Sequence, residues 1–236
     1  MALRIALWAA VVVLVLIGFT AAIARAVHVA DATARLEVIR LSFPVLTGFV
    51  SDPAARMREI TEFDGPFARH PVAARLHTIG GAAFLLLAPL QFMAPLRRRF
   101  VRLHRWMGRT LLMIGLPIGV SGLYFGLLMP FAGPLEAVVV ALAGGLFLFS
   151  MGRAFLAIRA GDVERHREWM IRAFATAIGI STVRVTGGML DGALTPYGYS
   201  VRQILGISLW LGWLLTLAAA EVWIRRSRYH LETRIA

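Results

Sequence analysis

The chain has 236 residues, of which 58% are apolar and only 16% are charged. An ordinary soluble domain is about half apolar and about a quarter charged, and one core built from a chain of this length cannot hide so much apolar surface. The composition therefore excludes a disordered or fibrous chain and argues against a soluble enzyme. All 25 basic residues are arginine and cysteine is absent, which excludes disulfides and thiolate metal ligands.

Six stretches of the sequence are apolar over about 20 residues, the length that an α-helix needs to cross the hydrocarbon core of a bilayer. They cover residues 5–24, 72–94, 108–129, 135–158, 169–189 and 204–224. This pattern predicts an all-α fold, a polytopic membrane bundle of six transmembrane helices. The predicted divisions are a first transmembrane helix at 1–24, an extracytoplasmic loop at 25–71, a five-helix membrane core at 72–224 and a cytoplasmic basic tail at 225–236. Within the loop, residues 30–41 could form a short helix at the membrane surface.

The distribution of arginine predicts the orientation. Arginines concentrate in three segments outside the spans, at 97–105, 159–167 and 225–234, whereas 130–134 has none and 190–203 has only Arg202. Because positively charged segments stay on the cytoplasmic side, both termini are expected in the cytoplasm and the protein in the cytoplasmic (inner) membrane. The sequence pI of about 11.6 then needs no nucleic-acid partner to explain it.

The first span also has the features of a signal peptide. Arg4 precedes the apolar run, and Ala24-Arg25-Ala26 resembles a cleavage site with small residues. The run is nevertheless long enough to cross the bilayer. Both interpretations give the later five spans the same orientation.

Four sequence blocks occur in an order that resembles a known family. They are His77-Thr78-Ile79-Gly80-Gly81, Pro89-Leu90-Gln91-Phe92, His104-Arg105-Trp106-Met107-Gly108-Arg109, and His166-Arg167-Glu168-Trp169-Met170-Ile171-Arg172-Ala173-Phe174 continuing to Arg184. In these blocks the chain resembles the domain-of-unknown-function 2306 family of bacterial membrane proteins, over roughly residues 70–189. The resemblance implies a bacterial multi-pass membrane protein and draws attention to the histidines, but it implies no reaction.

His104 and His166 stand at the predicted cytoplasmic edges of two parallel spans, each followed by an arginine and a tryptophan. If these helices are neighbours, the two imidazoles could bind the iron of a b-type haem from its two sides. The arginines that could then meet the haem propionates are Arg105, Arg109, Arg167 and Arg172. The same cluster is also typical of an interfacial anchor, with tryptophan in the aromatic belt and arginine on lipid phosphates.

Two further ionisable residues are expected inside spans near the outer side. Arg184 lies four to five residues from the outer end of the fifth span and His77 lies at a comparable depth in the second. A charged group at the centre of a span costs roughly 2.5–3.5 kcal/mol on insertion scales, so each is a candidate functional residue. Together they could line an outer cavity that accepts an anion or a carbonyl oxygen. The alternative is that Arg184 reaches the interface or pairs with Asp191 and that His77 donates to a backbone carbonyl.

Three functions remain open at this stage. The first is a redox protein with haem b, which could exchange electrons with quinone or a protein partner. The second is a small transporter or a lipid- or anion-binding protein that uses the His77 and Arg184 cavity. The third is an accessory membrane subunit without catalytic activity, in which histidine and tryptophan only set the depth of the helices.

Overall fold

The computed structural model describes residues 2–27 and 53–235, and every regular element within these ranges is helical. Six of the helices are long and apolar enough to cross a membrane. They are α1 (Ala2–Val27), α4 (Pro71–Gln91), α6 (Val101–Leu128), α7 (Pro134–Arg159), α8 (Val163–Leu194) and α9 (Val201–Ile235). The predicted all-α fold with six candidate spans is confirmed. The helix expected at residues 30–41 lies outside the described residues.

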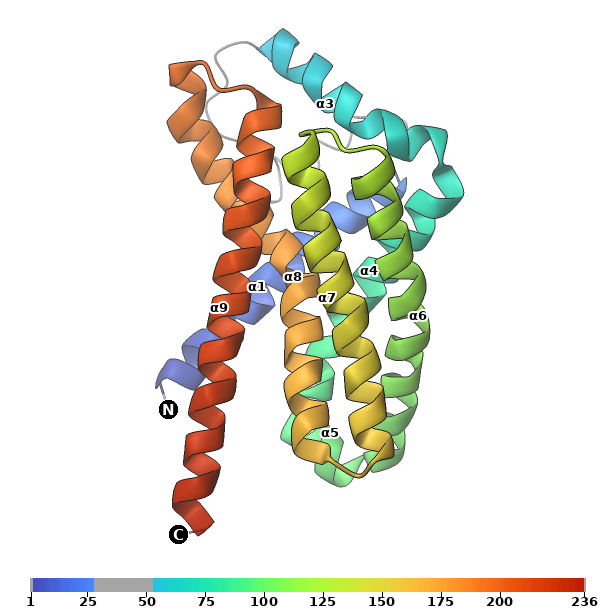
Figure 1. Cartoon of the computed structure of the whole chain (residues 1–236), viewed down its shortest axis with the longest axis vertical. Coiled ribbons are helices and arrows are strands. Elements are labelled where there is room, and N and C mark those ends of the chain that lie inside the picture. The colour runs from blue at the N-terminus through green and yellow to red at the C-terminus, as the bar shows by residue number, and fades with distance from the viewer. Residues whose placement is uncertain (1, 28–52, 236) are drawn as a thin grey trace.

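Helices α4, α6, α7 and α8 form a four-helix bundle in which neighbours along the chain are neighbours in space (Figure 1). Because α8 also contacts α4, the bundle closes, and α6 and α8 occupy opposite corners. Helix α1 crosses the seam between α4 and α8, and α9 packs along α8. The two helices that carry His104 and His166 therefore run in the same direction on opposite sides of one interior.

Two shorter helices mark the two ends of the bundle (Figure 1). Helix α3 (Pro53–Arg69) lies across the end at which α4 begins, and α5 (Ala94–Arg99) lies at the opposite end. These are called the α3 end and the α5 end below. The sequence reading assigned both segments to connections between spans, because neither is apolar over a membrane-spanning length.

The core of the bundle combines aromatic and small side chains. Phe84 and Phe147 meet edge to face with their ring centroids 5.4 Å apart, beside the fully buried Leu111. Towards the α5 end the fully inaccessible Ala154 and Ala173 lie among larger buried residues such as Met170 and Phe174. Helix α1 contributes Val15 to the same core, so it is part of the packed structure.

Two helices are longer than the apolar spans that predicted them. Helix α8 continues to Leu194, five residues past the end of the predicted span, and α9 continues to Ile235 through the segment predicted as a separate tail. Arg184 consequently lies ten residues before the end of α8, which is about 15 Å along the helix axis.

Candidate functional site

The position of His166 is set by the turn and cap that start α8 and by a hydrogen bond to α7. Gly161 has a left-handed backbone (φ 78°) that ends the turn after α7, and the Asp162 carboxylate caps α8 by accepting from the Arg165 amide at 2.9 Å. One turn into α8, the Nδ1 atom of His166 lies 2.9 Å from the Ala154 carbonyl oxygen of α7. Because a carbonyl can only accept, the proton of a neutral imidazole is assigned to Nδ1. The lone pair of Nε2 is then available to a metal. A hydrogen bond from the other ring nitrogen to a carbonyl, like the one from Nδ1 to Ala154, commonly orients metal-binding histidines.

His104 enters the same end of the bundle from α6. Its Nδ1 atom is buried and has no hydrogen-bond partner. The imidazole lies within electrostatic range of His166 and of Arg97 and Arg105. The structure thus places the two histidines in one layer at the α5 end, on helices that stand at opposite corners of the bundle and are not neighbours.

A third polar side chain reaches this layer from α4. Gln91 is the last residue of that helix, is 7% exposed, and leaves its Nε2 atom buried without a partner. Its Oε1 atom lies 3.7 Å from the position that a Cβ atom would take on Gly108, one turn past His104. The layer therefore contains two buried polar atoms that lack partners within the part of the chain that the structure describes. In the sequence Gln91 belongs to the Pro89-Leu90-Gln91-Phe92 block, but nothing in that block indicates a role for its side chain.

The arginines near the histidines divide into two groups. Arg105 is exposed and close to His104, and Arg167 donates to the Ser227 hydroxyl at 3.1 Å. Arg172 instead donates to both carboxylate oxygens of Glu221 on α9, at 2.6 and 3.0 Å. Arg109 stacks on Trp106, whose side chain is 66% exposed on the outside of the bundle. Arg167 and Arg172 thus each have a hydrogen-bond partner on α9, whereas Arg105 lies within electrostatic range of His104.

The second pair of predicted residues lies in the half of the bundle nearer the α3 end. His77 is within electrostatic range of Arg184, and also of Arg25 near the end of α1. Its Nδ1 atom donates to the Ile118 carbonyl of α6 at 3.1 Å. Arg184 donates to the Ile180 carbonyl at 3.0 Å, one turn back on its own helix. Arg25 forms an ion pair with Asp64 of α3 at 2.8 Å.

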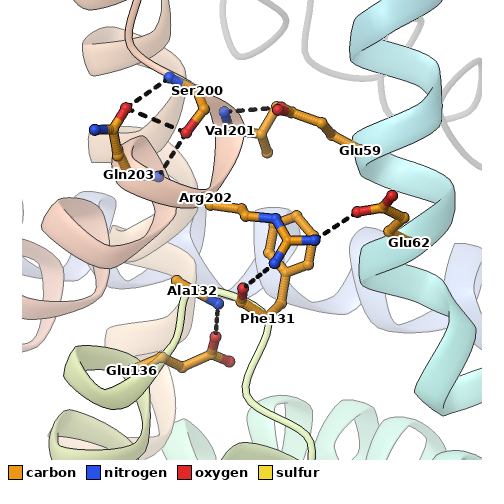
Figure 2. Close-up of polar contacts among 9 residues, drawn as sticks. All are labelled: Glu59, Glu62, Phe131, Ala132, Glu136, Ser200, Val201, Arg202 and Gln203. Carbon is orange, nitrogen blue, oxygen red and sulfur yellow. Dashed lines mark hydrogen bonds and ion pairs between the residues drawn. The ribbon is translucent and has the colours of Figure 1, made fainter.

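Helix α3 is fastened over this end by two of its glutamates, which contact the first residues of α9 (Figure 2). The Glu59 carboxylate accepts from the Val201 amide at 2.9 Å, and Glu62 pairs with Arg202 at 2.5 Å. Arg202 also donates to the Phe131 carbonyl at 3.2 Å and stacks on its ring. These contacts hold α3 in place, so that Asp64 can reach Arg25.

The sequence model of a family described as predicted membrane protein (DUF2306) matches residues 74–224, which is more than half of the chain. The chain belongs to the DUF2306 family. No curated protein and no solved structure matches this DUF2306 chain.

The family match covers the four-helix bundle and most of α9. It therefore extends beyond the resemblance found in the sequence, which ended near residue 189. The match includes His77, His104, His166 and Arg184, and it excludes Arg25 and Asp64. In this DUF2306 protein, the Arg25–Asp64 ion pair near Arg184 thus comes from segments outside the matched region.

Sequence reasoning missed Arg25 and Asp64 as site residues. In the sequence Arg25 resembles part of a cleavage site, and Asp64 is one of several acidic residues in a loop with little net charge. Arg25 falls at the end of an apolar run, where an arginine is usually solvated. Its burial depends on α3 lying across it, so nothing in the local sequence could have shown it.

Proposed function

We propose that this DUF2306 protein is a membrane-bound cytochrome that holds one haem b between His104 and His166 at the α5 end. The observation that carries the proposal is that two imidazoles from opposite corners of one bundle lie within electrostatic range of each other, with the Nδ1–H of His166 donating to a backbone carbonyl. Ligation by two histidines on facing helices is a recurring way to hold a haem in a helical bundle.

The environment of the two histidines suits a planar ring. Gly108 carries no side chain one turn beyond His104, and the carbonyl that orients His166 belongs to the fully buried Ala154. Small residues of this kind allow helices and a flat group to approach closely. The buried Nδ1 atom of His104 and the Nε2 atom of Gln91 are two polar atoms that lack partners in the described structure. Arg105 and Arg167 lie at the same end and would meet the propionates.

A bound haem would make the protein a one-electron carrier, with the iron alternating between its ferric and ferrous states. The electron partner is a quinone in the bilayer or a redox protein at the α5 end. Histidine ligands, hydrogen bonds to them and burial are the features by which a protein sets the potential of such a haem. Here only His166 has such a hydrogen bond, to the Ala154 carbonyl. Among the described residues, Nδ1 of His104 has no partner.

The test is a dithionite-reduced minus oxidised visible spectrum of detergent-purified protein, expressed with ample haem supply and quantified as pyridine haemochrome. The proposal expects a sharp α-band with about one haem per chain. His104→Ala and His166→Ala should each lose the band. His70→Ala is the matched control and should keep it, because His70 lies at the start of α4 near the α3 end, 3.4 Å from the Tyr124 hydroxyl. A flat spectrum from a folded, monodisperse sample, or full haem in both ligand variants, would overturn the proposal.

Transport or binding of an anion or lipid, the alternative considered from the sequence, would use a different part of the protein. His77 and Gln91 are 14 residues apart on α4, which is about 21 Å along the helix axis. A ligand beside His77 would therefore leave the spectrum of a haem at the α5 end unchanged. Flux or binding that requires Arg184 but not His104 would favour this second function.

A further inference from the structure

Three basic side chains from three helices converge in the half of the bundle nearer the α3 end. Arg25 of α1, His77 of α4 and Arg184 of α8 lie within electrostatic range of one another. All three belong to candidate membrane spans. Charges inside a span are costly and normally face a partner or a water-filled cavity, so a cluster of like charges there calls for negative charge nearby.

One carboxylate supplies part of that charge. Asp64 pairs with Arg25 at 2.8 Å, and their side chains are only 7% and 14% exposed. The guanidinium of Arg25 also lies over the rings of Phe63 and Phe67, 5.0 and 4.2 Å from their centroids. Arg25 is therefore held on several sides by α3, and Asp64 balances its charge.

Arg184 keeps its charge without such a partner. A guanidinium has five N–H donors, and here one nitrogen donates to the Ile180 carbonyl. Within residues 2–27 and 53–235, no carboxylate forms an ion pair with Arg184. Since Arg25 is already balanced, the cluster carries at least one positive charge in excess.

A buried hydroxyl without a partner lies beside Arg184. Ser181 is fully inaccessible to solvent, and its Oγ atom has no hydrogen-bond partner among residues 2–27 and 53–235. It precedes Arg184 by three residues, so the two side chains share one face of α8. The hydroxyl is covered by Gly18 of α1, where an added Cβ would collide with Ser181 Oγ. A buried donor without an acceptor is expensive, and it points to a group that accepts hydrogen bonds at this position.

His77 completes the cluster from α4. Its Nδ1 atom donates to the Ile118 carbonyl, and Gly122 lies against the ring, with an added Cβ 3.0 Å from Cε1. These contacts fix the ring, and Nε2 is the atom left to face a ligand.

From this arrangement we infer a buried oxyanion site between α1, α4 and α8. Arg184 binds the anion and Ser181 donates a hydrogen bond to it. His77 and the Arg25–Asp64 pair lie closer to the α3 end, since Ser181 packs at the level of Leu85, eight residues after His77 on α4. The ligand is a phosphate group, because a guanidinium offers paired donors that match its oxygens and because the excess charge suits an anion. The phosphate is either free inorganic phosphate or the phosphate of an anionic phospholipid. The inference stands apart from the proposed haem site, since the two use different residues at different ends of the bundle.

The experiment measures thermal unfolding of delipidated, detergent-purified protein. One arm adds sodium phosphate, with sodium chloride at the same ionic strength as the control. The other arm adds phosphatidylglycerol in mixed micelles, with a phosphate-free galactolipid as the control lipid. Stabilisation by phosphate identifies the free anion, and stabilisation by phosphatidylglycerol alone identifies the lipid.

Variants decide whether the effect belongs to this site. Arg184→Gln should abolish the stabilisation and leave the visible spectrum of any bound haem unchanged. Arg98→Gln, which removes an exposed arginine of α5, is the matched control and should behave as wild type. No stabilisation of the wild type beyond the two controls, or equal stabilisation in Arg184→Gln, would overturn the inference.

A second variant keeps the test decisive if Arg184→Gln does not fold. Ser181→Ala removes a buried hydroxyl that lacks a protein partner, so the fold should tolerate it. The loss of one hydrogen bond to a charged ligand should raise the Kd for phosphate or phosphatidylglycerol about tenfold or more. An unchanged Kd in Ser181→Ala would remove this residue from the site and contradict the arrangement proposed.

Discussion

At the scale of single residues, burial separates two ion pairs that look alike in the sequence. Arg25–Asp64 is almost enclosed, with side chains 14% and 7% exposed, whereas Arg202–Glu62 is open to solvent, with side chains 52% and 58% exposed. Removing one partner of a buried pair leaves an uncompensated charge in a medium of low dielectric constant. An exposed charge that loses its partner is solvated by water instead.

Asp64→Asn should therefore destabilise the protein far more than Glu62→Gln. The expected losses are roughly 3–5 kcal/mol for the buried pair and less than about 1 kcal/mol for the exposed pair. Thermal unfolding of both variants in the same detergent measures the difference. The double variant Arg25→Leu with Asp64→Leu should recover part of the loss, because no unpaired charge remains. Equal melting temperatures for the two single variants would show that Asp64 does not stabilise Arg25.

At the scale of elements, glycine sets how closely α8 and α9 approach. A Cβ atom on Gly212 of α9 would lie 2.6 Å from the backbone nitrogen of Val183 and 2.7 Å from its Cα atom. Backbone atoms cannot move aside as a flexible side chain can. Close packing of this kind is the usual way in which transmembrane helices associate.

Gly212→Ala should separate α8 from α9 and lower stability by about 1–3 kcal/mol, the usual cost of overpacking. Gly145→Ala is the matched control on α7, because a Cβ atom there meets no atom within 4 Å. The control should keep or slightly raise the melting temperature, since alanine favours helix more than glycine does. A stable Gly212→Ala variant would contradict the close approach of these helices.

The packing of α1 bears on the two interpretations of the first span. Its buried residues Val15, Ile17 and Ala21 face the bundle, and Gly18 contacts Leu85 as well as Ser181. Removal of α1 would expose this seam between α4 and α8. We expect the intact mass of membrane-purified protein to include α1, and a variant without residues 2–27 to be less stable. A mature chain that begins after residue 26 would support the signal-peptide interpretation.

At the scale of the whole molecule, the arginine-rich segments meet at one end. Arg97, Arg98 and Arg99 of α5 share that end with the connection between α7 and α8. The positive-inside rule predicts that this end faces the cytoplasm. The absence of cysteine makes the orientation easy to measure, because any introduced thiol is unique.

A thiol introduced by Arg98→Cys should react with a membrane-impermeant maleimide in inverted vesicles but not in intact spheroplasts. Tyr197→Cys, at a side chain that is 81% exposed near the α3 end, should show the opposite pattern. Labelling of both variants after denaturation is the control for reactivity. The reverse pattern would place the α5 end outside and contradict the predicted orientation.

The sequence by itself determined the environment, the fold class and the six spans, because a span is a local property of about 20 consecutive residues. The similar blocks that begin at His104 and His166 predicted that both histidines stand near the starts of parallel helices. Residues at equivalent positions of such helices lie at similar depths in the membrane. The same reasoning placed His77 and Arg184 in one half of the protein. It could not show that α8 continues to Leu194, because helix ends beyond the apolar run carry little hydropathy signal.

Only the tertiary structure decided which side chains meet. Gln91 joins the histidine layer because α4 ends at that level, and Arg172 turns to Glu221 because α9 packs along α8. Arg25 is buried because α3, a segment that local hydropathy does not mark, crosses the end of the bundle and brings Asp64 to it. Such contacts join residues far apart in the chain, and their geometry depends on how whole helices pack. Hydropathy reports the preference of each segment for lipid and carries no information on its neighbours.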